Sequence, residues 1–451
     1  MSRESLTGLI EQEVGTMYSH PASSLVSQRG GARPMLQAAS RDEIATFQLN
    51  RLRNGLRRAL PGNAFYQRRL SDLASQPLAD FAEFTSLPFT TKADLVRDQS
   101  EHPPYGANLS FPLRDYVRLH QTSGTTGSPL KILDTTESWD WWADCWTVIL
   151  HAAGVTSDDI VYLAFSFGPF IGFWSAYEGA KRVGALVIPG GGQTSVQRLR
   201  SIMETQATVL ICTPTYALHL AEVGRAEGID TAASHIRVTV HAGEPGASIP
   251  NTRRRIEELW GARAYDHIGM TEMGAYGFTC INQDAVHVNE EEFIAEILDP
   301  VTNEPVAEGE RGELVLTNLG RWGCPAIRYR TGDLVQRGTR DCPCGRTYLT
   351  LPGGVLGRVD EMLIVRGVNV YPSSIEDVLR GFPEVEEYRI TRLKAGAMDE
   401  IELEVECPEA TVSAVGAALR QALSLRVPVR SVAPGSLPRY ELKARRIVLA
   451  E

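Results

Sequence analysis

The chain has 451 residues, of which 43% are apolar and 22% are charged; 45 basic and 55 acidic side chains give a formal net charge of −10. This composition is typical of a folded globular protein with two or three domains and argues against a disordered chain. The acidic balance excludes a basic surface for nucleic acid over the whole chain. Seven cysteines argue against a disulfide scaffold, and the first residues lack the apolar core of a signal peptide. We therefore expect a cytoplasmic protein.

The stretch 160–177 contains no charge and is nearly long enough to span a membrane. Gly168 and Pro169 stand at its centre, and a proline removes a backbone donor and breaks a helix. We expect a buried strand, a tight loop and the start of a helix, and no membrane span.

Residues 41–73 have apolar side chains at helical spacing, with basic residues on the other, solvated face. From about residue 115 to 351, short aliphatic runs alternate with amphipathic helices, a pattern that indicates parallel α/β layers. The expected buried strands are 159–165, 185–188, 208–212 and 236–240, and the expected helices between them include 195–206 and 250–260. Residues 285–335 form a strand-rich section.

Leu351, Pro352, Gly353 and Gly354 interrupt the pattern. Beyond them we expect a small α+β unit, with strands at 362–365, 388–393 and 400–407 and helices at 373–381 and 410–424. The predicted fold class is α/β: a large N-terminal domain (1–359) of α/β layers with a β-rich subdomain, followed by a small, mobile α+β domain (360–451).

The segment QTSGTTGSP, 121–129, has two glycines and four hydroxyl side chains in six consecutive residues. Backbone N–H and side-chain O–H groups in such a loop can converge on an anion. The chain contains no Gly-Lys dipeptide, so this is not the Gly-x-x-x-x-Gly-Lys phosphate loop, and it is not a Gly-x-Gly-x-x-Gly fingerprint. We predict a phosphate-binding loop of another kind.

This loop resembles the signature of the adenylate-forming superfamily of acyl-CoA synthetases, adenylation domains and luciferases. Within that superfamily, the chain most resembles the phenylacetate–CoA ligase family. Further segments occur in the family's order over roughly residues 40–450: LPFTTKADL (87–95), HAGEP (241–245), YDHIGMTE (265–272), YRTGDL (329–334), GRVD (357–360) and RGVNVYP (366–372).

The resemblance implies an ATP-dependent aryl-carboxylate–CoA ligase acting on an acid such as phenylacetate, benzoate or anthranilate. The carboxylate would attack the α-phosphate of ATP to give an acyl-adenylate and pyrophosphate, and the thiol of coenzyme A would then displace AMP. Because the first step brings two anions together, the site must supply positive charge and hydrogen bonds.

The resemblance also assigns roles to residues. The β- and γ-phosphates would be held by Ser123, Gly124, Thr125, Thr126 and Gly127. The expected catalytic residues are Thr271 on the α-phosphate, Glu272 on Mg²⁺, and Lys443 on the adenylation transition state, although Leu442 replaces the usual glycine before this lysine. Asp360 would be the hinge between the domains.

The nucleoside would be held by the later motifs. Asp333 would accept hydrogen bonds from the ribose hydroxyls, and Arg358 would contact the ribose or a phosphate. His267 would stack on the adenine. The remaining expected ATP and AMP contacts are Gly243, Glu244, Pro245, Asp266, Gly269 and Met270, together with Thr271. The expected acid pocket comprises Phe167, Phe170, Ala242, Gly243, Gly269 and Gly274.

Three cysteines and a histidine form a second candidate site: Cys280, His287, Cys342 and Cys344. Three thiolates and an imidazole suit tetrahedral Zn²⁺, which would be structural. The alternative is reduced, buried cysteines beside a core histidine. The charge runs 253–255 and 290–292 are expected on a solvated face.

Two other functions remain open at this point. The acyl group could pass to the phosphopantetheine of a carrier protein instead of free coenzyme A, or the chain could be a nucleotide-binding protein without catalytic activity. The resemblance also raises the expectation of a homodimer.

Overall fold

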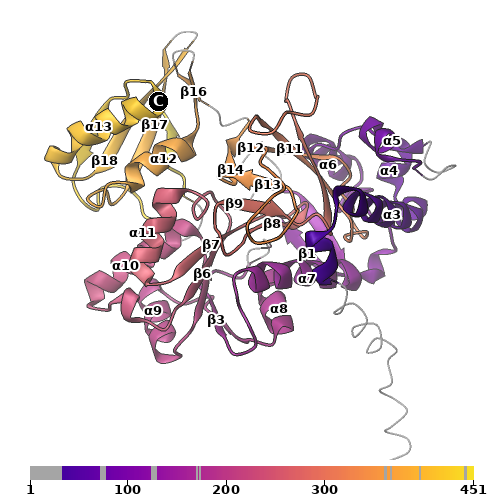
Figure 1. Ribbon diagram of the computed structural model, residues 1–451, viewed down its shortest axis with the longest axis horizontal. Helices are drawn as coiled ribbons and strands as arrows, with labels where there is room; N and C mark the ends of the chain where they lie inside the picture. The colour runs from indigo at the N-terminus through magenta and orange to yellow at the C-terminus, as the bar shows by residue number, and fades with distance from the viewer. Residues whose placement is uncertain are drawn as a thin grey trace, which may run out of the picture.

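The computed structural model describes residues 33–71, 78–122, 129–168, 171, 174–359, 363–365, 368–395, 398–440 and 444–450. Figure 1 shows the chain running from the indigo N-terminal helices, through the magenta and orange sheets, to a yellow C-terminal lobe. The α-helices are α3 (Arg41–Ala59), α4 (Ala64–Arg69), α5 (Phe81–Ser86), α6 (Lys92–Glu101), α7 (Thr136–Ala152), α8 (Trp174–Val183), α9 (Ser195–Glu204), α10 (Pro214–Glu227), α11 (Pro250–Trp260), α12 (Pro372–Arg380) and α13 (Glu409–Leu423). Short 3₁₀ turns occupy Arg33–Ala38, Leu60–Gly62, Leu113–Asp115 and Thr231–Ala233.

The described strands form four sheets. A hairpin contains β1 (Tyr116–Gln121) and β2 (Lys131–Thr135), and an eight-stranded sheet has the order β13-β9-β8-β7-β6-β5-β3-β4. The strands of the large sheet are β3 (Ile160–Leu163), β4 (Leu186–Pro189), β5 (Val209–Cys212), β6 (Val238–His241), β7 (Arg263–Met270), β8 (Gly274–Thr279), β9 (Ala285–Val288) and β13 (Thr350–Pro352).

The other two sheets follow in sequence. A four-stranded sheet has the order β10-β11-β12-β14, and the C-terminal sheet has the order β16-β15-β18-β17-β20, with β19 paired to β18. Their strands are β10 (Phe293–Leu298), β11 (Arg311–Asn318), β12 (Tyr329–Gln336), β14 (Val355–Arg358), β15 (Leu363–Val365), β16 (Val368–Val370), β17 (Tyr388–Ala395), β18 (Met398–Glu406), β19 (Val429–Val432) and β20 (Ile447–Leu449).

The parallel half of the eight-stranded sheet confirms the predicted α/β layering. Strands β3 to β7 pair in parallel, and consecutive residues along them face different cores. On β5, Val209 and Ile211 pack in the core that contains α7 and α8, whereas Leu210 and Cys212 pack in the core that contains α9, α10 and α11. Helices thus cover both faces, which explains why these strands read as continuous apolar runs.

The uncharged stretch 160–177 contains a strand and the start of a helix, as expected. Strand β3 ends at Leu163 and α8 begins at Trp174. Among the described residues, no helix is long and apolar enough to cross a membrane. Within it, Val161, Tyr162 and Leu163 of β3 are wholly buried in the large sheet.

The acidic run 290–292 is buried, so its expected place on a solvated face is wrong. Glu290, Glu291 and Glu292 are only 2%, 7% and 5% exposed. Glu290 pairs with Arg41 at 2.7 Å, and Glu292 pairs with Arg51 at 2.8 Å. Because both arginines project from α3, these carboxylates attach the N-terminal helix to the start of β10.

The C-terminal sheet has a hydrophobic core of its own, which it shares with α12 and α13. In Figure 1 this yellow lobe lies beside the pink helices, with α12 next to α11. Asn251 of α11 donates to Asp377 of α12 from its backbone at 3.1 Å, and Arg255 donates to the carbonyl of Phe382 at 3.1 Å. Part of the basic run 253–255 thus contacts the C-terminal lobe instead of facing solvent.

Candidate active site

The candidate site lies at the carboxyl ends of β6 and β7. These strands pair in parallel, with His241 opposite Asp266, so the segments that leave them emerge side by side. Ligands of open α/β sheets bind at this edge. Residues 242–245 follow β6 directly, and β7 continues beyond this pairing to Met270, before Thr271 and Glu272.

Asp333 and Arg358 face each other across β12 and β14. The Arg358 Nη1 atom lies 3.1 Å from Asp333 Oδ1, and the hydroxyl of Tyr276 donates to Asp333 Oδ2 at 3.2 Å. Tyr276 belongs to β8, so this bond joins the four-stranded sheet to the large one. Gly332 has φ +73°, and a Cβ there would lie 2.6 Å from an Arg358 nitrogen. Glycine thus permits the close approach of Arg358 to this turn.

Glu272 lies in the turn between β7 and β8 and is 8% exposed. The nearest described cation is Lys92, whose Nζ is 3.8 Å from Glu272 Oε1. Lys92 begins α6, and Thr90 pairs with β12 through Thr90 N to Arg328 O (3.0 Å) and Arg330 N to Thr90 O (2.9 Å). The segment 87–95 is recognisable in the sequence as a motif, but no sequence pattern gives Lys92 a role. Only the fold brings Lys92 to Glu272.

Asp266 is engaged within the protein. Its carboxylate accepts hydrogen bonds from Ser248 N at 3.0 Å and from His267 N at 3.1 Å, and the Ser248 hydroxyl also donates to it. Burial raises the pKa of Asp266 to about 7, although these hydrogen bonds oppose the shift. Asp266 therefore acts here as a fixed acceptor for the loop after β6.

His267 is buried, which conflicts with the expected stacking on adenine. The side chain is 6% exposed, its ring lies 4.4 Å from the ring of Trp146, and its Nδ1 is 2.9 Å from the carbonyl oxygen of Gly277. Burial lowers the pKa of His267 to about 4, so the ring is neutral. Successive side chains of a strand point to opposite faces, and the half-buried neighbour Ile268 is the better candidate to face a base.

The Glu244 side chain is engaged within the protein, and its contact to a nucleotide stays a prediction. One carboxylate oxygen accepts from Thr215 N at 2.9 Å, and the other accepts from Ala444 N at 2.8 Å. Burial raises the pKa of this carboxyl, and the nearby Arg446 opposes the shift. Glu244 thus connects α10 to the C-terminal segment.

The described acid-pocket residues are only partly open to a ligand. Phe167 is half-buried and packs edge-on against Trp174 at 4.7 Å. Gly243 and Gly269 are exposed, whereas Ala242 is 8% exposed. Gly274 is buried against Trp141.

The four predicted zinc ligands do converge. Their donor atoms all lie within 4.8 Å of one another: Cys280, His287, Cys342 and Cys344. The Cys280 and Cys342 sulfurs are 3.7 Å apart, and the Cys344 sulfur is 3.6 Å from His287 Nε2. All seven cysteines lie in the described part of the chain and are free thiols.

The remaining predicted site residues lie outside the described residues. They are Ser123, Gly124, Thr125, Thr126, Gly127, Phe170, Asp360 and Lys443.

Residues 78–320 match the AMP-binding enzyme family, and residues 367–449 match the AMP-binding enzyme C-terminal domain. The phenylacetate-coenzyme A ligase of Pseudomonas putida is 36% identical over 381 residues, which is 82% of this chain and 83% of the relative. The phenylacetate-coenzyme A ligase of Escherichia coli (strain K12) is 33% identical over 432 residues, 91% of this chain and 96% of the relative.

A solved structure of 2-hydroxyisobutyryl-CoA ligase, in the postadenylation state with 2-HIB-AMP, is 31% identical and superposes with a TM-score of 0.87 over 92% of each chain. The same ligase in the thioesterification state, with 2-HIB-AMP and CoA, gives a TM-score of 0.71 at 32% identity, over 92% of this chain and 91% of that one. These family matches cover both lobes and the strand ends described above. The chain therefore belongs to the AMP-binding enzyme family and is an adenylate-forming acid–thiol ligase that uses ATP and coenzyme A.

Proposed function

We propose that this enzyme converts an aromatic carboxylic acid to its coenzyme A thioester through an acyl-adenylate, with release of pyrophosphate and AMP. The observation that carries the proposal is the Asp333–Arg358 pair beside the turn that holds Thr271 and Glu272, in a chain that matches phenylacetate-coenzyme A ligases. A carboxylate on a strand and a second carboxylate in a buried turn can hold the two ends of a nucleotide, the ribose and the metal-bound phosphates.

In the first step, the acid carboxylate attacks the α-phosphate of ATP and pyrophosphate leaves. Asp333 accepts the ribose hydroxyls, Thr271 donates to the α-phosphate, and Ser123–Gly127 bind the departing phosphates. Lys92 beside Glu272 and Arg358 beside Asp333 supply two positive charges here, and Lys443 adds a third. Such preorganised charges and donors offset the repulsion between the two anions.

Glu272 fits a Mg²⁺ ion by its chemistry. It is a buried carboxylate whose nearest described cation, Lys92, is still 3.8 Å away. Carboxylate and phosphate oxygens are the ligands that this hard cation prefers. When bound, Mg²⁺ would neutralise phosphate charge, and Glu272 would fix its position.

An aromatic acid is supported by the side chains around the strand ends. Phe167 and Trp174 are both half-buried and pack together at 4.7 Å. Aromatic and other apolar side chains are the usual lining of a pocket that takes such a ligand.

In the second step, the coenzyme A thiol attacks the acyl carbon and AMP leaves. We propose that the C-terminal lobe, residues 360–451, rotates about Asp360 between the steps. The two states of 2-hydroxyisobutyryl-CoA ligase, with TM-scores of 0.87 and 0.71 to this chain, support two arrangements of one fold.

We also propose that Cys280, His287, Cys342 and Cys344 bind one structural Zn²⁺. Tetrahedral coordination with Zn–S near 2.3 Å and Zn–N near 2.1 Å sets sulfurs about 3.8 Å apart, and sulfur and nitrogen about 3.6 Å apart. The two separations of 3.7 and 3.6 Å in the structure fit these values. Burial also lowers the pKa of His287 to about 4, which leaves a neutral imidazole with a free lone pair.

The test is pyrophosphate release from ATP with phenylacetate, benzoate, anthranilate, acetate and 2-hydroxyisobutyrate, each with and without coenzyme A. We expect release with one aromatic acid and its thioester by mass spectrometry. Preference for 2-hydroxyisobutyrate would assign a small hydroxy acid instead. Release without a thioester would indicate a carrier-protein acceptor, and ATP binding without release for any acid would contradict the proposal.

A further inference from the structure

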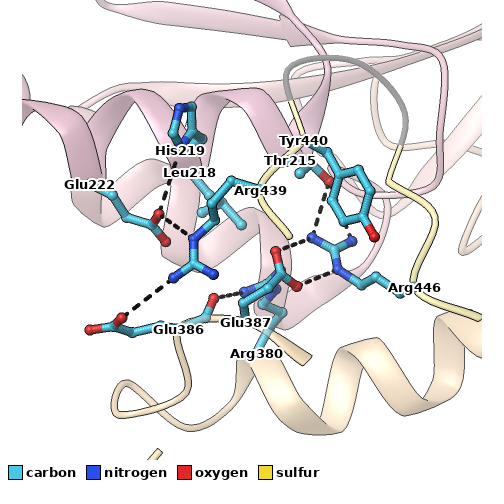
Figure 2. Close-up of a pocket in the computed structure, with 10 residues that line it drawn as sticks. All are labelled: Thr215, Leu218, His219, Glu222, Arg380, Glu386, Glu387, Arg439, Tyr440 and Arg446. Atoms are coloured by element: carbon cyan, nitrogen blue, oxygen red, sulfur yellow. Dashed lines mark hydrogen bonds and ion pairs between the residues drawn. The ribbon is translucent and has the colours of Figure 1, made fainter. Parts of the chain in front are cut away.

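The end of the chain returns to the large domain at the start of α10. Figure 2 shows this junction, with Thr215, Leu218, His219 and Glu222 on one helix and Arg439, Tyr440 and Arg446 on the yellow C-terminal chain. Arg439 Nε is 3.4 Å from Glu222, which adds an ion pair between the two parts.

Glu244 joins three segments at this junction. Its two oxygens accept from the backbone N–H groups of Thr215 and Ala444, at 2.9 and 2.8 Å. Ala444 directly follows Lys443, and Glu244 lies in the turn that follows β6. One carboxylate thus fixes the backbone next to the proposed catalytic lysine.

Arg446 contacts the side-chain hydroxyl of the same threonine, whose backbone N–H donates to Glu244. Both terminal nitrogens of Arg446 lie 3.4 Å from Thr215 Oγ1, while its Nε donates to Glu387 at 2.6 Å. Its Nη1 is also 3.4 Å from Glu376, and the residue is 8% exposed. The guanidinium therefore links the C-terminal sheet and α12 to the first turn of α10.

These contacts belong to the arrangement of the lobes in this structure. The chain superposes on the postadenylation state of 2-hydroxyisobutyryl-CoA ligase with a TM-score of 0.87, and on the thioesterification state with 0.71, at 31% and 32% identity. Identity and coverage barely change between these two comparisons, so the arrangement seen here is close to the postadenylation one.

We propose that Glu244 and Arg446, with Thr215 between them, form a latch that fixes Ala444, the residue after Lys443, for adenylate formation and opens before the thioester step. This inference rests on the proposed two-step function. Glu244 and Arg446 are positioning residues, because they act on the chain next to Lys443 and not on the reacting atoms. If the latch favours one arrangement, weakening it should slow the half-reaction that needs this arrangement and spare the other one.

Two variants test the latch in the full-length enzyme. Glu244→Gln replaces one accepting oxygen by an amide NH₂ group, and Thr215→Val removes the hydroxyl that Arg446 contacts while retaining the side-chain shape. The first half-reaction is followed as single-turnover pyrophosphate release with phenylacetate and ATP. The second is followed as thioester formation from synthetic phenylacetyl-adenylate and coenzyme A.

We expect adenylate formation to slow by about tenfold or more, the loss typical of a hydrogen bond to a charged group, with thioester formation unchanged or faster. ATP affinity should stay within about twofold. A tenfold weaker ATP affinity would instead make Glu244 a nucleotide contact, and equal losses in both half-reactions would make it merely structural; either result overturns the latch. Glu404→Gln is the matched control, because Glu404 pairs with Arg389 and Arg430 inside the C-terminal sheet.

A second measurement does not need an active enzyme. Amide hydrogen exchange of Thr215 and Ala444, measured on peptides that contain them, should accelerate in Glu244→Gln and not in Glu404→Gln. Unchanged exchange would overturn the latch, whichever acid the enzyme uses. A wild-type enzyme that releases no pyrophosphate with any acid, but shows the exchange effect, would contradict the proposed function and confirm only that Glu244 holds Thr215 and Ala444.

Discussion

Arg321 and Asp134 form an ion pair that is wholly excluded from solvent. Arg321 Nε and Nη2 each lie 2.6 Å from an oxygen of Asp134, and both side chains are 0% exposed. The guanidinium stacks on Trp142 at 4.4 Å and donates a third hydrogen bond to the carbonyl of Thr271. The residue before Glu272 is thus tied to β2, the strand that follows the predicted phosphate loop.

Replacing one partner of this pair should destabilise the fold severely. Arg321→Leu leaves the Asp134 carboxylate buried without its cation, and such changes cost about 3–5 kcal/mol. Arg58→Leu is the control, since its pair with Glu137 is 52% and 46% exposed and should contribute less than about 1 kcal/mol. Urea denaturation measures both, and similar losses in the two variants would refute the importance of burial.

Chelation should test the proposed zinc site. Purified enzyme should contain about one zinc per chain by elemental analysis. Its removal should lower thermal stability without reducing affinity for ATP, because the ligands connect β8, β9 and the loop before β13. A metal-free enzyme in which the three thiols of the site are titratable and the melting temperature is unchanged would contradict the site.

Serine substitutions separate zinc binding from cysteine packing. Cys342→Ser should abolish stoichiometric zinc, whereas Cys407→Ser should retain it, since Cys407 packs in the core of the C-terminal lobe. Retention of zinc by both variants would place the metal elsewhere.

Local sequence patterns sufficed to predict most elements. Helix α11 spans Pro250–Trp260, as predicted, because a proline opens the helix and Gly261, in the left-handed conformation, ends it. The strands after residue 208 were placed to within a few residues, since an uninterrupted aliphatic run between turns can only be buried. The proline, the glycine and the aliphatic runs that identify these elements are all close together in sequence.

The errors concern contacts between residues far apart in sequence. The sequence around Glu290 and Glu292 is that of a solvated charge run. Their partners, Arg41 and Arg51, lie on α3, about 250 residues earlier in the chain, so no local pattern indicates their burial. The bond between Glu244 and Ala444 joins residues 200 apart in the chain, which no local pattern indicates. The face of His267 depends on how β7 pairs with its neighbours, and a shift of one residue reverses every side chain.

Acid should destabilise the enzyme through three buried histidines. Burial lowers the pKa of His120, His241 and His267 to about 4, against 6.5 in the unfolded chain. Between these values the unfolded chain binds more protons, so stability must rise with pH and be lost as pH falls from about 6.5 to 4. Each group contributes up to about 1.4 kcal/mol per pH unit.

A single substitution should reduce this slope. In His241→Gln, the increase in unfolding free energy from pH 5 to pH 6, measured with urea, should be smaller by about 1 kcal/mol than in the wild type. Parallel curves for His241→Gln and the wild type would show that His241 titrates normally in the folded enzyme.

Lys443 should act in the first half-reaction only. Lys443→Ala removes a positive charge that would be preorganised for the adenylation transition state, and loss of one such group slows a reaction by about 10²–10³-fold. ATP binding should change little, and thioester formation from synthetic phenylacetyl-adenylate should persist, because that step forms no bond to the phosphate. Arg445→Ala, which removes a neighbouring exposed cation, is the control. If single-turnover pyrophosphate release were equally fast in both variants, Lys443 would have no part in the mechanism. Lys92, which lies beside Glu272, would then be the leading candidate for the positive charge that adenylation requires.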